Sequence, residues 1–400
     1  MKNLMCIKKL MPAYCIGLLL ASCTATGDMN DIIKKGLNVA EAQALCLAKE
    51  ILDKEEQLPR TYENNELKTS SYKAWTSGFF PGTLWYLYEN NPTKKLKKYA
   101  EIYTSRVEEA KNVTDHHDTG FMVYCSFGNG YRLTGNPHYL EVMKTGAQSL
   151  ATRYNPVVGA IKSWDWNSDG EWQYPVIIDN MMNLELLMCV SKTTNNEEYS
   201  NISISHAEKT LEYHFREDHS AYHVVSYDTL TGQAHAKHTH QGFAHESAWA
   251  RGQAWGLYGY TMMYRETGMP EFLEKARNIA LFIINHPNLP ADKIPYWDFD
   301  DPQIPNVPRD ASAAAIIASA LIELSRLDKS EESSLWLDFA KEQIRTLTSP
   351  AYLAKAGSNG GFILKHSVGN LNRNSEVDVP LSYADYYYVE ALLRLKKLQQ

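Results

Sequence analysis

The chain of 400 residues lacks several features that define common classes of protein. Its six cysteines are few and scattered, so the sequence does not encode a disulfide framework. No HExxH or CxxC pattern is present, which removes the usual signatures of a zinc site. Basic residues number 40 against 47 acidic ones, and this balance disfavours nucleic acid as a partner.

Long apolar runs are also missing. The clearest run, residues 10–20, follows three lysines and has the length of a secretory signal, too short for a membrane span. It ends in Leu-Ala-Ser-Cys, which resembles the bacterial lipobox. We therefore expect residues 1–22 to be a lipoprotein signal peptide and Cys23 to carry the lipid. Cleavage removes three lysines and no acidic residue, so the net charge changes from −7 to −10.

This leader predicts a location in the bacterial cell envelope, on the periplasmic or outer-membrane face, with the membrane contacted only through the lipid anchor. Three cysteines remain in the mature chain, Cys46, Cys125 and Cys189, each among apolar residues with helical spacing. We expect them to be buried thiols.

Eight of the thirteen histidines lie between His206 and His245. A zinc site built from His235, His238 and His240 is one interpretation, but their spacing fits no standard zinc site. Contacts to a polar ligand, or surface positions, are the alternatives. The sequence predicts neither a metal nor an organic cofactor.

The chain is rich in aromatic residues, with 25 tyrosines and 9 tryptophans. Sugar-binding clefts use such residues against the C–H face of a pyranose, and an aromatic core is the alternative. No low-complexity linker divides residues 30–398, so we expect a single domain over residues 23–400.

Helical periodicity dominates this domain, and punctuation such as Gly-Asn-Pro at 135–137 separates the helices. Alternate helices are charged on one face or apolar on most sides, which suggests an outer and an inner layer. Six such hairpins predict an all-α (α/α)6 toroid; an α-solenoid or an irregular bundle are the alternatives. The twelve helices are expected near residues 30–55, 78–90, 93–111, 119–134, 137–153, 180–194, 196–216, 246–267, 270–286, 310–327, 331–348 and 381–398.

If the inner helices all run the same way, their N-termini gather at one mouth, where free N–H groups favour an anionic ligand. Residues 221–241 break the helical pattern and predict a short β-hairpin over this mouth.

Residues 164–187 combine three tryptophans with an apolar run that ends at Asp179, directly before a helical pattern. A carboxyl group in apolar surroundings has a raised pKa and can act as a general acid. Asp is also a favoured N-cap residue, so capping the following helix is the alternative role.

Seven motifs, in order over residues 70–398, resemble the unsaturated glucuronyl hydrolases of glycoside hydrolase family 88. They are WTSGFFPG from Trp75, HHDTGF from His116, SWDW from Ser163, DNMMN from Asp179, HQG from His240, SAWARGQAW from Ser247 and NSEVDVPLSYADYYYVEALLRL from Asn374. The resemblance implies an (α/α)6 barrel. It also implies release of the non-reducing-end 4,5-unsaturated uronic acid from lyase-generated glycosaminoglycan oligosaccharides, by protonation at C4 and water addition at C5.

The resemblance also implies roles for individual residues. Asp179 matches the general acid/base of the family and Asp118 its second essential aspartate. Arg251 is expected to hold the substrate carboxylate, because guanidinium offers paired donors. The other positions expected to bind substrate are Trp75, His117, Trp164, His223, Gln241, Trp255 and Ser367.

Ser367 is associated, through the resemblance, with acceptance of sulfated substrates. Two other functions remain open at this point. One is hydrolysis of unsaturated rhamnogalacturonan, as in the related barrel family, which shares the chemistry but differs in the +1 sugar. The other is a non-catalytic, glycan-binding lipoprotein of the envelope.

Overall fold

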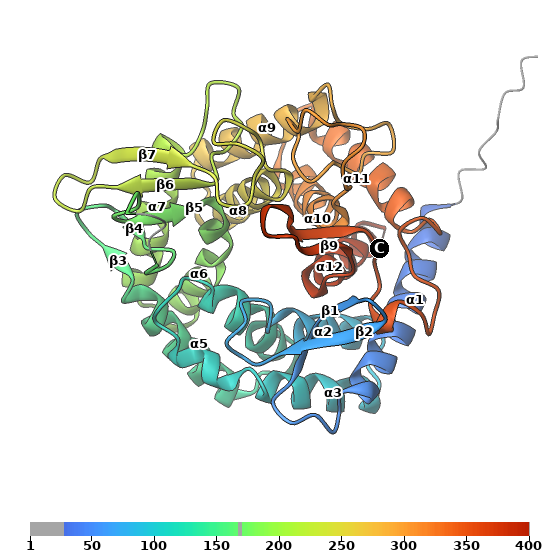
Figure 1. Cartoon of the computed structure of the whole chain (residues 1–400). Helices are drawn as coiled ribbons and strands as arrows, with labels where there is room; N and C mark the ends of the chain where they lie inside the picture. Colours follow the sequence, from blue (N-terminus) through green and yellow to red (C-terminus); the bar gives the residue numbers. More distant parts are fainter. Residues whose placement is uncertain (1–27, 167–169, 400) are drawn as a thin grey trace, which may run out of the picture.

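A computed structural model describes residues 28–166 and 170–399, and its helices form two concentric rings (Figure 1). The predicted signal peptide and Cys23 lie outside the described residues. The outer ring contains the helices with charged, exposed faces. They are α1 (Met29–Glu50), α3 (Lys94–Ser105), α5 (Pro137–Ala151), α7 (Glu197–Tyr213), α9 (Pro270–Asn285) and α11 (Ser333–Leu347).

The inner ring contains the apolar helices. Two of these begin with a non-α segment, the π-helix η2 (Gly120–Gly128) before α4 and the 3-10 helix η3 (Ile178–Met182) before α6. The inner α-helices are α2 (Phe79–Asn90), α4 (Asn129–Thr134), α6 (Leu184–Thr194), α8 (Ala250–Thr267), α10 (Ala311–Leu327) and α12 (Ser382–Leu398).

Burial explains the division into two rings. In α3, Leu96, Tyr99 and Tyr103 are buried on one face while the lysines on the other face are exposed. In α10, every residue from Ala311 to Ile322 is buried, because other helices surround it. Helix α12 packs against α1, α2 and α10, so the last inner helix closes the ring. The predicted (α/α)6 toroid is confirmed.

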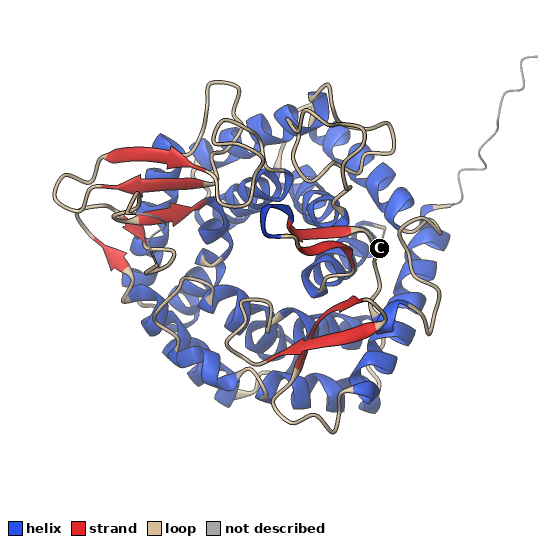
Figure 2. Cartoon of the chain, viewed as in Figure 1, coloured by secondary structure: helices blue, strands red, loops and turns tan. Residues whose placement is uncertain are grey.

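The predicted hairpin is present as β6 (Val224–Tyr227) and β7 (Ala234–His238). It forms a three-stranded antiparallel sheet with β5 (Pro175–Ile177), which the sequence did not predict. Figure 2 shows this sheet toward the edge of the ring. Three further hairpins were not predicted: β1 (Leu58–Glu63) with β2 (Glu66–Ser70), β3 (Tyr154–Asn155) with β4 (Ala160–Ile161), and β8 (Ser367–Asn370) with β9 (Ser375–Val379).

The three mature cysteines are all free thiols, but they are not all buried. Cys125 is buried, Cys189 is partly buried, and Cys46 is exposed on α1. The prediction of a buried thiol is therefore wrong for Cys46. Its neighbours Ala44, Leu47 and Ala48 face the core, while Cys46 lies on the solvent side of the helix. Within residues 28–166 and 170–399, no helix is both long and apolar enough to cross a membrane.

Candidate active site

Buried polar atoms without a hydrogen-bond partner in the described residues gather near the N-terminal ends of the inner helices. Buried polar atoms in folded proteins are normally paired, so a cluster of unpaired ones marks the place where a polar ligand would bind. The cluster consists of His117 Nδ1, Trp164 Nε1, Asp179 Oδ2, His223 Nε2, Arg251 Nε, Trp255 Nε1 and the Tyr383 hydroxyl.

Two adjoining hollows open at this end of the ring and share Arg60 and Trp75; together we call them the cleft. The first, of about 360 Å³, is also lined by Lys73, Ala74, Thr76, Asp115, His116, Asp118, Trp164 and Trp166. The second, of about 330 Å³, is also lined by His240, Gln241, Arg251, Gly369, Asn370, Arg373, Ser375, Glu376 and Tyr383.

A close backbone contact joins the segments that carry the two aspartates. Asp118 precedes the π-helix η2, and Asp179 lies in η3, directly after β5. A Cβ atom on Gly120 would lie 2.4 Å from the Cα atom of Asn183, so only glycine allows this approach. The Phe121 N–H then donates to Asn183 Oδ1 at 2.8 Å. This contact fixes η2 against the segment that follows Asp179.

Burial raises the pKa of Asp179 to about 7. The charge of Arg251 and the indole of Trp255 act in the opposite direction, while the charge of Asp118 raises the pKa further. Asp179 is 9% exposed, and Oδ2 has no hydrogen-bond partner in the part of the chain that the structure describes. Near neutral pH this carboxyl group can hold a proton and can also release it, as a general acid/base requires.

The alternative role of Asp179 as a helix N-cap is wrong. Ile177 occupies the cap position of η3 and Asn183 that of α6, and neither helix start has a side-chain capping bond. Asp179 instead lies inside the first turn of η3. Its carboxylate is therefore not occupied by helix capping.

Asp118 has the opposite electrostatic character. Burial acts to raise its pKa, but the imidazoles of His117 and His116 outweigh burial, and the pKa of Asp118 falls below the ordinary value. His117 Nε2 lies 3.3 Å from Asp118 Oδ1, and His116 Nδ1 lies 3.1 Å from Oδ2. Burial lowers the pKa of His117 to about 4, so this imidazole is neutral at pH 7. The site thus pairs a carboxylate with a carboxyl group that can be protonated.

The tautomer of His223 follows from its hydrogen bonds. Its Nδ1 accepts from the backbone N–H groups of His240 at 3.0 Å and Gln241 at 3.1 Å. The proton must therefore be on Nε2, which lies 3.6 Å from Asp179 Oδ2. Burial holds the pKa of His223 well below its usual range. His223 is a neutral N–H donor directed at Asp179.

Aromatic residues surround this pair of carboxyl groups. Trp75 lines both hollows and packs against Tyr383 at 4.8 Å between ring centroids. Trp164 lines the first hollow, and Trp255 is fully buried against Phe121 at 5.2 Å. The three tryptophans predicted from the sequence are thus placed around the predicted aspartates.

Arg251 is only 1% exposed and is held mainly by the protein itself. Its Nη1 donates to Asp310 Oδ2 at 3.2 Å and to the Val368 carbonyl, and its Nη2 donates to the Gly369 carbonyl at 2.6 Å. Nε is the nitrogen that has no partner among the described residues. Because Nη2 carries a second hydrogen, Arg251 keeps two N–H groups for a ligand, one on Nε and one on Nη2.

The remaining predicted residues differ in their access to the cleft. Gln241 lines the second hollow and donates from Nε2 to the Gly369 carbonyl at 3.1 Å. Ser367 is fully buried in β8 and lines neither hollow, although its hydroxyl has no partner within the described ranges. Its role in accepting sulfate remains a prediction.

Among the residues that line the cleft and were not predicted as site residues are Arg60, Trp166, Arg373 and Tyr383. Tyr383 could have been found from its place at the start of the last inner helix. In the described part of the chain, no group of three or more His, Cys, Asp or Glu side chains is arranged to hold a metal ion.

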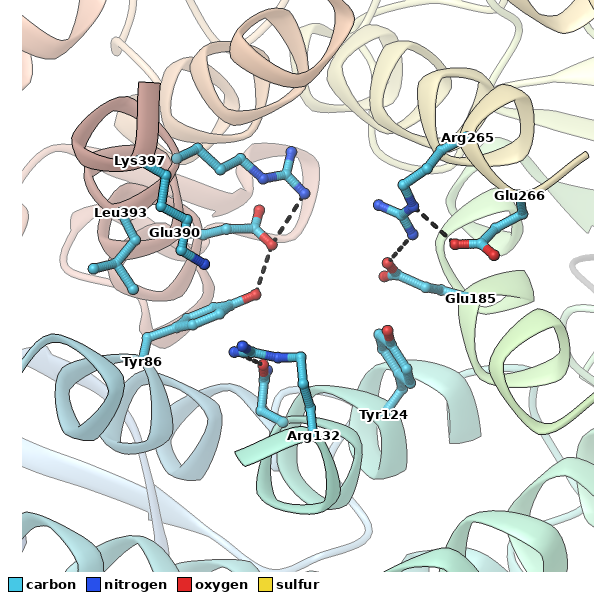
Figure 3. Close-up of a pocket in the computed structure, with 11 residues that line it drawn as sticks. Tyr86, Tyr124, Arg132, Glu185, Arg265, Glu266, Glu390, Leu393 and Lys397 are labelled. Carbon is cyan, nitrogen blue, oxygen red and sulfur yellow. Dashed lines mark hydrogen bonds and ion pairs between the residues drawn. The ribbon is translucent and has the colours of Figure 1, made fainter. Parts of the chain in front are cut away.

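Another cavity, of about 280 Å³, is lined by residues that include Arg132 of α4, Arg265 of α8 and Arg394 of α12, near the C-terminal ends of these helices (Figure 3). Several of its charged groups pair with one another: Arg265 binds Glu185 at 2.6 Å and Glu266 at 2.8 Å, and Arg394 binds Glu390 at 3.3 Å. We assign the active site to the cleft, because Trp164, Arg251 and Tyr383, three of the residues with unpaired buried atoms, line it together with Asp118.

Residues 48–347 match Glycosyl Hydrolase Family 88. An unsaturated glucuronyl hydrolase from Formosa agariphila is 50% identical over 327 residues, which cover 82% of this chain and 81% of that protein. A crystal structure described as an unsaturated glucuronyl hydrolase specific for heparin has a TM-score of 0.89 and 49% identity, covering 92% of this chain and 98% of its own. The unsaturated glucuronyl hydrolase from Bacillus sp. GL1, described as responsible for the degradation of glycosaminoglycan, has a TM-score of 0.84 and 30% identity, covering 90% of this chain and 97% of its own.

Proposed function

The chain belongs to glycosyl hydrolase family 88 and is a glycosidase that releases an unsaturated uronic acid from oligosaccharides by hydrolysis, and we propose that Asp179 supplies the proton for this reaction. The C4=C5 bond and the ring oxygen of the substrate form a vinyl ether. Protonation of C4 by Asp179 leaves a positive charge shared by C5 and the ring oxygen.

Water then adds at C5, and the Asp179 carboxylate takes the proton that the water loses. The sum of the two steps is the addition of one water molecule, and Asp179 regains its starting state. The resulting hemiketal opens, and the glycosidic bond is lost in the rearrangement. Asp118 stays ionised through both steps, and its negative charge stabilises the cation at C5.

The observation that carries this proposal is the pairing of a buried carboxyl group whose pKa is about 7 with a second carboxylate whose pKa is lowered. One group can be protonated at neutral pH while the other is ionised. The neutral His223 N–H lies 3.6 Å from Asp179 Oδ2, which has no hydrogen-bond partner among the described residues. Trp75 and Trp164 provide flat surfaces for an unsaturated ring.

The proposed substrates are unsaturated disaccharides from glycosaminoglycans, with heparin-type disaccharides first. The support is the 49% identity with a structure described as specific for heparin. The test follows the ultraviolet absorbance of the conjugated alkene with heparin, chondroitin and pectin disaccharides. We expect the parent protein to remove the absorbance and Asp179→Asn to leave it unchanged. Activity on the pectin product alone, or an active Asp179→Asn variant, would contradict the proposal.

Ser367 is proposed to favour sulfated substrates, on the basis of its unpaired hydroxyl beside the residues that bind Arg251. The test is the ratio of turnover of sulfated to unsulfated disaccharide. We expect Ser367→Ala to lower this ratio, and an unchanged ratio would remove the support.

We further propose that the protein is anchored in the bacterial envelope by a lipid on Cys23. The support is the lipobox-like sequence after an apolar segment of signal length. A labelled fatty acid is expected in the parent protein and not in Cys23→Ala, which should also leave the membrane fraction. Equal labelling of both would refute the anchor.

A further inference from the structure

Trp166 is an exposed tryptophan at the edge of the cleft. Its side chain is 43% exposed, and its ring stacks on Trp164 with centroids 4.6 Å apart and planes at 12°. It also lies 5.2 Å from the Trp172 ring and 4.9 Å from the His240 ring. Three aromatic rings thus pack against an indole that is still partly open to solvent.

Arg373 lies next to this indole. Its guanidinium carbon is 5.9 Å from the centre of the Trp166 ring. Arg373 lies in the 3-10 turn η5 (Leu371–Arg373), between β8 and β9. The side chain is exposed, lines the second hollow, and forms no hydrogen bond or ion pair with any residue in the described ranges. Its charge is therefore available to a ligand.

The turn that carries Arg373 is tied to the cleft. Asn372 Nδ2 donates to the Gly242 carbonyl at 2.8 Å, and Gln241 Nε2 donates to the Gly369 carbonyl at 3.1 Å. Asn370 Oδ1 also accepts from the Arg373 N–H at 3.2 Å. These bonds place Arg373 on the same side of the cleft as His240.

Arg60 provides a second positive charge in both hollows. Its Nε binds Glu376 at 2.6 Å, and its two terminal nitrogens have no partner among the residues described. Asp115, which is 81% exposed, and Asp118 are the carboxylates that line the first hollow, and Glu376 lines the second. The edge of the cleft beyond Asp118 thus combines an open aromatic face with two arginines that can bind an anion.

We propose that Trp166 and Arg373 form an outer sugar subsite, beyond the bond that is broken, which stacks one sugar ring and binds its anionic substituent. The inference rests on the proposed function, because the subsite serves the leaving part of the substrate. The anion is either a sulfate on the sugar next to the unsaturated uronate or the carboxylate of a further uronate. Guanidinium binds both, so the substrates in the test separate them.

The test measures KM and kcat for three substrates: an unsulfated unsaturated disaccharide, the same disaccharide with a sulfate on its second sugar, and an unsulfated unsaturated tetrasaccharide. The variants are Arg373→Gln, Trp166→Ala and Trp166→Phe. The controls are Arg326→Gln, an exposed arginine on α10, and Leu230→Ala, a side chain that is 87% exposed.

For Arg373→Gln we expect KM to rise about tenfold for one of the two anionic substrates, with kcat unchanged. A rise for the sulfated disaccharide identifies sulfate as the group bound, and a rise for the tetrasaccharide identifies the carboxylate. Trp166→Ala should raise KM for the same substrate, and Trp166→Phe should retain most of the affinity, because a ring face remains. For Arg373→Gln, KM for the unsulfated disaccharide should change less than twofold, because this substrate lacks the anion that Arg373 binds.

The inference is overturned if every KM stays within twofold of the parent value, or if Arg326→Gln has the same effect as Arg373→Gln. A parent protein that turns over none of the three substrates would instead refute the proposed function. Thermal unfolding of each variant checks that Trp166→Ala is folded, and the unsulfated disaccharide reports the intact catalytic pair.

Discussion

His223 Nε2 lies 3.6 Å from Asp179 Oδ2, and neither atom forms a hydrogen bond within the part of the chain that the structure describes. This separation exceeds the distance of a good N–H···O hydrogen bond. A small approach of the two groups would make that bond, and it would stabilise Asp179 as a carboxylate after its proton has been given to the substrate. The hydrogen bond between His223 and Asp179 would therefore contribute most after Asp179 has given up its proton.

The pH dependence of kcat/KM should reflect Asp179 in the free enzyme. Because its pKa is about 7, we expect kcat/KM to fall about tenfold per pH unit above pH 7, as the proton is lost. At low pH, activity should persist to about pH 4, since the pKa of Asp118 is lowered and that of His117 is about 4. The measurement is the absorbance assay from pH 3.5 to 9.5 on the unsulfated disaccharide.

The two buried histidines near Asp179 would give a different pH profile if one of them were the catalytic base. His117 and His223 both have lowered pKa values and are neutral over the range from pH 5 to pH 8. An inflection near pH 6.5 with activity rising towards alkaline pH would indicate a histidine base and would contradict the role given to Asp179.

Asp179→Asn should abolish activity and also stabilise the fold at alkaline pH. The folded state raises the pKa of Asp179, so the stability linked to this group is complete below the ordinary carboxyl pKa and is lost as pH rises to about 7. Asparagine cannot ionise. The variant should therefore exceed the parent in free energy of unfolding at pH 8, by at most about 4 kcal/mol, and by much less at pH 4.5.

Urea unfolding of both proteins at the two pH values measures this difference. Asp115→Asn is the matched control, because that side chain is 81% exposed and should not give the same gain at pH 8. A parent protein that is equally or more stable than Asp179→Asn at pH 8 would show that the carboxylate is not destabilised by burial.

The ring of helices could be predicted from the sequence because the burial of each helix face requires apolar residues at particular positions. A helix such as α3 needs only one apolar face, whereas α10 needs apolar residues all round, and both patterns are visible without any structure. The helix starts were also visible where a cap marks them, as with Asn136, whose side chain accepts from the His138 N–H at 3.0 Å.

The non-α starts of two inner helices could not be predicted in this way. The π-helix η2 follows Asp118 and the 3-10 helix η3 contains Asp179, and both sequences have ordinary helical periodicity. The unusual geometry arises from contacts between segments more than 60 residues apart, such as Phe121 with Asn183. Wider π-helical turns such as η2 are frequent at functional sites.

The role expected for Arg251 also needed the structure. The sequence indicated paired donors for a carboxylate, and only the structure shows which donors remain. Asp310 and the Val368 carbonyl use both N–H groups of Nη1, and the Gly369 carbonyl uses one of the two on Nη2. These partners lie 59 to 118 residues along the chain from Arg251, and no local pattern connects them. The proposed outer subsite could not be predicted for the same reason, because Trp166 and Arg373 are far apart in the sequence and lie side by side only in the folded protein.

Gly120→Ala should damage both stability and catalysis. Its new Cβ would lie 2.4 Å from Asn183 Cα and 2.6 Å from the Asn183 carbonyl oxygen, and backbone atoms cannot move aside as a flexible side chain does. We expect a loss of about 1–3 kcal/mol in unfolding free energy. We also expect kcat to fall more than KM rises, because η2 and η3 are displaced from one another.

Gly256→Ala in α8 is the matched control, because a Cβ there meets Ile279 and Ile178 side-chain atoms at 3.5 to 3.6 Å, which is ordinary contact. This variant should keep parent activity and stability within about 1 kcal/mol. Equal behaviour of the two alanine variants would show that the Gly120 contact does not position the aspartates.

Asp310 should prove to be a positioning residue for Arg251. The ion pair is almost fully buried, with 2% of the Arg251 and none of the Asp310 side chain exposed. Asp310→Ala leaves the buried guanidinium without its counter-charge and removes the cap from α10, so we expect a loss of about 3–5 kcal/mol in urea unfolding. Asp310→Asn keeps an oxygen that can cap the Ser312 N–H, and its loss should be smaller.

The kinetic effect of Asp310→Asn separates positioning from stability. If Asp310 only stabilises the fold, KM and kcat of the folded variant will equal those of the parent. If it holds Arg251 so that Nε faces the cleft, KM for every unsaturated substrate should rise about tenfold, sulfated or not, because the hydrogen bond to the substrate is lost. The rise should also be absent from a variant that already lacks the guanidinium, so Arg251→Lys with and without Asp310→Asn should share one KM.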